Sequence, residues 1–288
     1  MPVDLVKFVI NAAAISSLYL LVAIGFTLIF GVGEVLNFAH GALLTVGAYT
    51  SYHAVNAWGM GLWAALALSA VVSGVLGAVL YRGVVQYIRD QPVVTIIVTI
   101  ILGFAIEAVL GAVFGGGTIT LSSPVPGGVE VLGREVQTHF VFVFVLSWTV
   151  VVLLVSYINH TPTGKAVQAT NMSKRGASLV GIDADNVNTY VWAVAAALAG
   201  VAGVLLLAFQ TGSPSMGLDP MVLSFSIVVL GGLGSLRGSI VGAYIIGFLD
   251  TAMTTLIAPS LTGLAGLVML VVVLLVRPQG LFGRSTSS

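Results

Sequence analysis

The chain has 288 residues, of which 58% are hydrophobic and 7% charged, and its ten basic and ten acidic side chains give a formal net charge of zero. A soluble domain carries about 25% charged residues because its surface must face water. The composition therefore excludes a soluble protein and predicts an integral membrane protein surrounded by a lipid bilayer. Zero net charge argues against nucleic acid as a partner. Because the chain has no cysteine, disulfides and thiolate metal sites are excluded as well.

Apolar runs divide the chain into candidate membrane spans, each of which needs about 20 mostly apolar residues. The strong candidates are 8–31, 61–81, 93–114, 139–158, 188–210, 238–257 and 260–276. Two weaker segments, 37–55 and 220–236, are interrupted by Gly, Ser and Thr, and are either full spans or broken helices that line a cavity. The first run lacks a cleavage signal and is expected to be a span. The sequence thus predicts an all-α polytopic membrane protein, 1–288 forming a single transmembrane domain with about seven to nine transmembrane or partly inserted helices.

The distribution of Lys and Arg predicts the orientation, because these residues accumulate in cytoplasmic loops. They occur in the 82–92 loop, the 159–187 loop and the tail from 277, whereas the 115–138 loop has only Arg134. The basic segments are therefore expected inside and 115–138 outside, which places the N-terminus outside if there are nine crossings. Alternating β-branched residues around Gly133 predict a small hairpin in the outer loop. This loop is either a simple connector or a docking surface for an external partner.

Enzymatic motifs are missing from the sequence. Neither H-E-x-x-H nor G-x-S-x-G occurs, and no His has other metal-ligating residues around it. The pair Gly164-Lys165 is followed by Ala166, so it is not part of a phosphate-binding loop. We expect no metal, no cofactor and no ATP bound by this chain, and no enzymatic activity of its own.

The 159–187 loop is the most informative polar stretch. In a first helix-compatible run Ala166, Ala169 and Thr170 share one face, and a second run places Ala177, Val180 and Gly181 on one side. Two short amphipathic helices at the cytoplasmic surface would suit a partner that holds them in a groove. The alternative is a solvated loop that merely follows the charge rule for cytoplasmic segments.

Four sequence blocks resemble those of branched-chain amino-acid ABC permeases of the LivH type. In chain order they are N-F-A-H-G at 37–41, G-K-A-x-x-A at 164–169 with Ala177 and Gly181 following, V-L-G-G-L-G-S at 229–235, and R-P-x-G-L-F-G at 277–283. They occur in the same order as in the family and extend over nearly the whole chain. The chain departs from the family at Lys165 and Gln168, where relatives tend to have Arg, and this difference bears on pairing with a particular ATPase.

The resemblance implies an ABC importer permease fold and a multi-component importer in the cytoplasmic membrane of a prokaryote. A second, related permease subunit would complete the pathway, two cytoplasmic ATPases would use ATP, and an external binding protein would deliver Leu, Ile or Val. The loop 159–187 would then couple the permease to the ATPases. The residues expected to carry this coupling are Gly164, Lys165, Ala166, Ala169, Ala177 and Gly181.

Four polar residues inside predicted spans are candidates for the translocation path. Glu107 and Asp250 are acids at membrane depth, where an unpaired charge costs several kcal/mol. They either bind the substrate ammonium or, when protonated, donate to hydroxyls such as those of Thr95, Ser226 or Thr251. Asn37 and His40, expected near the cytoplasmic start of the second segment, either line the path or cap a broken helix.

Two other functions are compatible with the same pattern. A permease of the same superfamily could carry urea, amides or sugars, because the motifs identify the scaffold more firmly than the cargo. A proton-coupled secondary transporter would use Glu107 and Asp250 without any ATPase, although the 159–187 loop argues against it.

Overall fold

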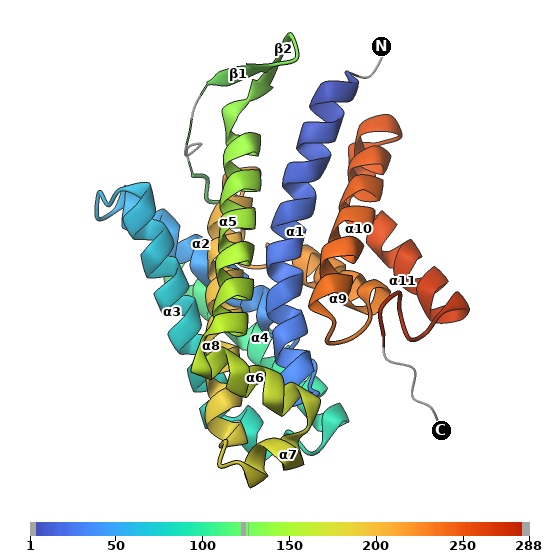
Figure 1. Cartoon of the computed structure of the whole chain (residues 1–288). Helices are drawn as coiled ribbons and strands as arrows, with labels where there is room; N and C mark the ends of the chain where they lie inside the picture. Colours follow the sequence, from blue (N-terminus) through green and yellow to red (C-terminus); the bar gives the residue numbers. More distant parts are fainter. Residues whose placement is uncertain (1–3, 122–124, 126, 284–288) are drawn as a thin grey trace.

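The computed structural model describes residues 4–121, 125 and 127–283. Figure 1 shows a bundle of long helices with one small hairpin at one end. In chain order the elements are α1 (Leu5–Gly33), α2 (His40–Asn56), α3 (Leu62–Gly83), η1 (Val85–Tyr87), α4 (Pro92–Phe114), β1 (Gly128–Val131), β2 (Arg134–Gln137), α5 (Thr138–His160), α6 (Pro162–Met172), α7 (Lys174–Leu179), α8 (Ala184–Leu207), α9 (Leu218–Gly231), α10 (Leu236–Leu256), η2 (Pro259–Leu261) and α11 (Leu264–Val276).

Seven helices of the described chain are long and apolar enough to cross a membrane, and they coincide with the seven strong segments of the sequence. Each differs from its predicted bounds by a few residues, as expected where helix ends fray. The predicted all-α polytopic fold is thus confirmed. The two weaker segments became α2 and α9, which have 17 and 14 residues.

Both weak segments are broken helices that begin inside the bundle. The ring of His40, the first residue of α2, lies 3.2 Å from the carbonyl oxygen of Val22 in the interior of α1. Val22 is eleven residues before the end of α1, which corresponds to about 16 Å along the helix axis. Residues 34–39 therefore re-enter the membrane before α2 starts. The sequence placed His40 near the cytoplasmic start of its segment; His40 does begin α2, but this start lies deep in the bundle and not level with the end of α1.

Helices α1 and α8 form the centre of the bundle. In their most apolar windows, 83% of α1 and 72% of α8 is buried by neighbouring helices, compared with 17% for the peripheral α11 segment. Small residues allow the central helices to approach closely, as is typical of membrane bundles. Gly200 of α8 lies directly against Gly47 of α2, and a Cβ atom on either glycine would collide with neighbouring backbone. Gly203 packs in the same way against Leu44 of α2.

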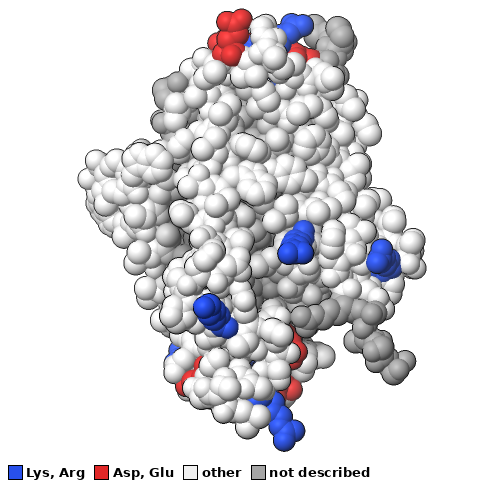
Figure 2. Space-filling model, in the orientation of Figure 1, with Lys and Arg blue, Asp and Glu red and all other residues white. Residues whose placement is uncertain are grey.

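The two ends of the bundle carry the charged loops. The N-terminal start of α1 and the β1–β2 hairpin lie at one end, where Arg134 Nε is 3.6 Å from Asp4 Oδ2. The helices α6 and α7 lie at the opposite end. Figure 2 shows charged side chains at the hairpin end and, on this face, basic side chains spread over the lower half, with an uncharged zone between the two groups. The 159–187 loop, predicted inside, and the hairpin, predicted outside, thus lie at opposite ends of the bundle, and the side that each end faces stays a prediction. Residues 122–124 and 126 of the predicted outer loop, and Arg284 of the tail, lie outside the described residues.

The predicted hairpin and the two predicted loop helices are present, but α7 ends at Leu179, so Val180 and Gly181 do not share a helical side with Ala177 as predicted. Strands β1 and β2 pair antiparallel, with Val129 opposite Val136, on either side of a turn at Leu132-Gly133. In the 159–187 loop, Thr161 and Ser173 cap α6 and α7 by accepting hydrogen bonds from Gly164 N and Gly176 N. These caps satisfy N–H groups that a helix start leaves unpaired. The polar residues that interrupt the loop thus define where its two helices begin.

We expect the contact between Gly47 and Gly200 to be sensitive to a single methyl group. Gly47→Ala should destabilise the protein by about 1–3 kcal/mol, the usual cost of overpacking a tight interior. The measurement is the melting temperature of the detergent-purified chain, together with its monodisperse yield. Gly83→Ala is the matched control, because a Cβ at Gly83 meets no atom within 4 Å. Equal stability of both variants would contradict the close packing of α2 on α8.

Candidate functional site

The break before α2 is held together by the N-F-A-H block. Asn37 Oδ1 accepts a hydrogen bond of 3.0 Å from Ala39 N, and Phe38 N donates to Thr99 Oγ1 of α4 at 3.2 Å. The side chains of Asn37 and His40 are 1% and 0% exposed. Backbone groups at membrane depth must find partners within the protein. Of the two interpretations left open by the sequence, the geometry favours the one in which Asn37 and His40 fix a broken helix.

Helix α9 begins at the same place as α2. The backbone of Gly217, which precedes α9, lies against the backbone of Gly41 in the first turn of α2. Neither helix start has a side-chain cap among the described residues. Gly103 of α4 faces the same junction, since a Cβ there would lie 3.5 Å from Ala39 Cα. Two half-helices and α4 thus converge inside the bundle.

Asp250 is a structural acid in this fold. It is 3% exposed, and its carboxylate accepts hydrogen bonds from Tyr19 Oη at 3.2 Å and from Gly263 N at 2.7 Å. The expected hydroxyl partners were Thr95, Ser226 and Thr251, whereas the observed partner is a tyrosine of α1. Asp250 therefore joins α1 and α10 to the turn before α11.

Glu107 has a different environment. It is half-buried on α4 and lines a cavity of about 170 Å³ at the junction of α2, α4 and α9. No hydrogen bond or ion pair reaches its carboxylate from the residues that the structure describes. The two intramembrane acids, which the sequence could not distinguish, are thus distinct in the structure. Asp250 is bonded to the scaffold, and Glu107 faces open space.

Asp219 is an acid at this junction that sequence reasoning missed. It lies just before the predicted segment 220–236, whereas in the structure it is in the first turn of α9, next to Leu218, which lines the same cavity. Its side chain is exposed. The signal that could have revealed it is the order Asp219-Pro220 before an apolar run, since acids and Pro favour the first turn of a helix.

The 159–187 loop folds as two helices, and its six candidate coupling residues have different environments. Gly164 and Ala177 are buried within this chain, and Ala166 and Ala169 are partly buried. Lys165 is exposed, and Gly181 adopts a left-handed backbone with φ of 82°. A partner cannot reach Ala177, so the expectation that its small side chain admits a partner's groove was wrong. The large apolar side chains that the loop does expose are Met172 at 74%, Leu179 at 81% and Val180 at 74%.

Lys174 connects this loop to the re-entrant segment. Its ammonium Nζ lies 3.1 Å from Gly33 O and 2.9 Å from Glu34 Oε2. Gly33 ends α1, and Glu34 has a left-handed backbone with φ of 59° where the chain turns back into the membrane. A displacement of α7 would therefore act directly on the segment that leads to Asn37 and His40.

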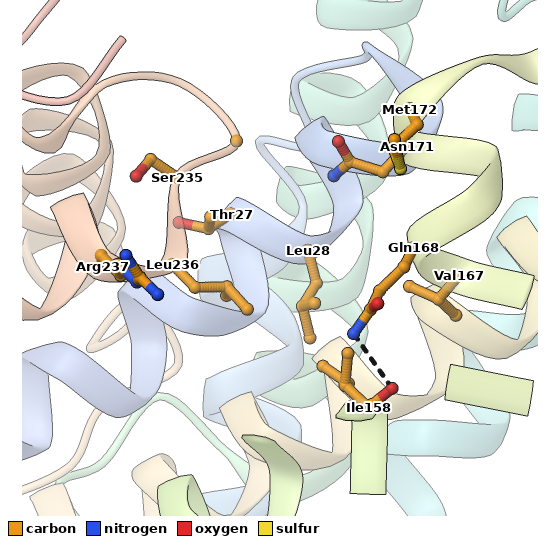
Figure 3. Close-up of a pocket in the computed structure, with 11 residues that line it drawn as sticks. Thr27, Leu28, Ile158, Val167, Gln168, Asn171, Met172, Ser235, Leu236 and Arg237 are labelled. Carbon is orange, nitrogen blue, oxygen red and sulfur yellow. Dashed lines mark hydrogen bonds between the residues drawn. The ribbon is translucent and has the colours of Figure 1, made fainter. Parts of the chain in front are cut away.

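A cavity of about 320 Å³ separates α6 from the start of α10. Figure 3 shows Gln168 and Asn171 of α6 on one side of this cavity and Arg237 of α10 on the other, with Thr27 and Leu28 of α1 between them. Gln168 Nε2 donates to Ile158 O at 3.2 Å, which fixes α6 on the end of α5. The loop thus rests on α1 and α5, and the cavity leaves α6 space to move toward α10.

An ionic cluster fixes the 82–92 loop. Arg89 of the 82–92 loop forms an ion pair with Asp185 at the start of α8, and its guanidinium also donates to Tyr81 Oη at 2.9 Å. Burial lowers the pKa of Arg89, but the hydrogen bonds and charges of Tyr81 and Asp185 more than offset this effect and raise it above the ordinary value. The guanidinium therefore stays charged and holds this loop on α8.

Seven helices long enough to span a membrane, two half-helices that begin inside the bundle and a helical loop at one end define a multi-pass membrane protein of the transport-permease class. The family model described as "Branched-chain amino acid transport system / permease component" matches residues 8–276. The chain belongs to this family.

Individual relatives agree with the family match. The chain is 28% identical to the high-affinity branched-chain amino acid transport system permease protein LivH of Salmonella typhimurium, over 95% of this chain and 94% of the relative. It is also 28% identical to the permease protein BraD of Pseudomonas aeruginosa, over 96% of this chain and 94% of the relative. The permease protein LivM of Salmonella typhimurium is 25% identical, over 94% of this chain and 69% of the relative. No solved structure matches the chain significantly.

The structural role of Asp250 predicts a stability defect in its variants. Asp250→Ala should lower the free energy of unfolding by about 1–3 kcal/mol or more, because Tyr19 and Gly263 would lose a buried partner. Asp250→Asn, which still accepts from Gly263, should lose less. Thermal unfolding of the purified variants measures both effects, with the exposed hairpin variant Glu130→Ala as control. Wild-type stability of Asp250→Ala would refute the structural role.

Proposed function

We propose that this chain is the permease subunit of an ATP-driven importer that carries Leu, Ile and Val across the cytoplasmic membrane of a prokaryote. The observation that carries the proposal is the family match over residues 8–276, together with relatives named for branched-chain amino acid transport. LivH and LivM, both similar to this chain, carry the same system name, which supports a related second permease subunit as partner. Two cytoplasmic ATPases and an external binding protein complete the proposed complex.

The ATPases are proposed to dock on the exposed apolar side chains of the cytoplasmic loop. Met172, Leu179 and Val180 lie outside the membrane-spanning helices, so lipid tails do not cover them. Burial of one large apolar side chain contributes about 1.5–3 kcal/mol, which makes such residues suitable anchors. Lys165, exposed on α6, adds a positive charge at the same end of the molecule.

Leu179→Glu should reduce co-purification of the ATPases by about tenfold or more, because a carboxylate would be desolvated at the contact. The permease itself should keep its melting temperature, since Leu179 is 81% exposed. The matched control is Leu132→Glu in the outer hairpin, where Leu132 is 86% exposed at the opposite end of the molecule. Full recovery of the ATPases with Leu179→Glu would remove this loop as their docking site.

The contact of Lys174 with Gly33 and Glu34 predicts a separate coupling defect. Lys174→Ala removes a partly exposed ion pair worth at most about 1 kcal/mol, so the complex should still assemble and hydrolyse ATP. We expect fewer leucine molecules to be transported per ATP, because α7 no longer holds the re-entrant segment. Uptake and hydrolysis measured on the same proteoliposomes give this ratio. Arg175→Ala, the adjacent exposed basic residue, is the control, and an equal ratio in both variants would contradict the connection.

A further inference from the structure

The cavity beside Glu107 lies deep in the membrane region. Glu107 is fifteen residues from the cytoplasmic start of α4, or about 22 Å along the helix. The cavity walls come from the re-entrant segment before α2, from α4 and from the start of α9. It is thus bounded by the elements that break inside the bundle.

The carboxylate of Glu107 needs a partner that the described chain does not supply. The residues that line the cavity include no Lys or Arg. A charged side chain at this depth costs several kcal/mol when it faces lipid, and such residues usually face a water-filled path or a ligand. The face of α4 that carries Glu107 is therefore turned to the substrate path. A cationic group of the substrate would neutralise the acid.

The remaining walls of the cavity are apolar. Phe38, Ile100, Phe104, Leu218 and Met221 surround the carboxylate. The volume is about 170 Å³. A cavity of about 150 Å³ lined by such side chains can hold a benzene-sized ligand, so a branched hydrocarbon side chain fits here. One acid within an apolar pocket matches a molecule that has an ammonium group next to an aliphatic branch.

The adjacent helix starts suit the other charge of an amino acid. α2 and α9 begin at this cavity, and Ala42 and Leu218 in their first turns line it. Half-helix starts inside transporters favour the carboxylate of a substrate, because their N–H groups and dipoles are positive. The two helix starts support a site whose main features are Glu107 and the apolar walls.

We propose that this cavity is an intramembrane binding site for the transported amino acid, with Glu107 as the residue that binds its ammonium group. The site rests on the proposed function for its substrate class. Phe38, Ile100, Phe104 and Met221 hold the branched side chain during passage. Because Phe38 follows the segment that Lys174 holds, the site can be opened or closed from the cytoplasmic loop.

The first experiment measures leucine uptake by the reconstituted importer with saturating loaded binding protein. Glu107→Gln should lower uptake by about tenfold or more, since bonds to charged groups are the strong ones. Stimulation of ATP hydrolysis by the binding protein should persist, and Glu107→Asp should restore much of the uptake. If uptake by Glu107→Gln stays within about twofold of wild type, the loss is too small for a lost charge-assisted contact, and the proposed site is overturned. Absence of leucine uptake by the wild type would instead refute the proposed substrate.

The second experiment keeps Glu107 in place, so it remains decisive if the Gln variant fails to assemble. Phe104→Cys introduces a thiol at the cavity of this otherwise cysteine-free chain. In the assembled complex a cationic methanethiosulfonate should modify it faster than an anionic one, and leucine should slow the reaction. Leu132→Cys in the outer hairpin gives the reference ratio of the two reagents. Equal ratios at both positions, without protection by leucine, would overturn the proposal.

Discussion

The structure depends on one constraint, namely that backbone polar groups inside a bilayer must be satisfied by the protein itself. A continuous helix is the simplest way to satisfy these groups. The chain departs from it at two breaks, before α2 and before α9, and both breaks lie inside the bundle. Asn37 and Thr99 accept hydrogen bonds from the backbone before α2, and the break before α9 lies against Gly41. Helix α1 helps to cover the break before α2, because its Val22 carbonyl lies against the ring of His40.

The long spans could be predicted from composition, because 20 apolar residues have few other structures available in a membrane. The interrupted segments also signalled that α2 and α9 are not ordinary spans. Their depth could not be predicted, since the position of His40 against Val22 depends on how three helices pack. The same limit explains why the predicted segment 220–236 left out Asp219, which lies in the first turn of α9.

For the candidate site residues, too, the residue type could be read from the sequence, whereas the role depended on tertiary packing. Asp250 and Glu107 are equivalent in the sequence, each an acid within an apolar helix, and only the tertiary partners Tyr19 and Gly263 distinguish them. Ala177 looked suitable for a close contact because it is small, but a small residue serves equally well against its own chain, where it is 2% exposed. Periodicity gives the face of a helix, and it does not say whether that face meets the same subunit or another one.

The contact between Gly41 and Gly217 also has a genetic consequence. In most tight contacts a larger side chain on one helix can be compensated by a smaller one on its neighbour. Here both positions already carry the smallest residue, and each backbone fills the space of the other's missing side chain. A variant with a side chain at position 217 therefore has no suppressor at position 41. Second-site revertants would have to arise elsewhere, by changing the spacing between α2 and α9.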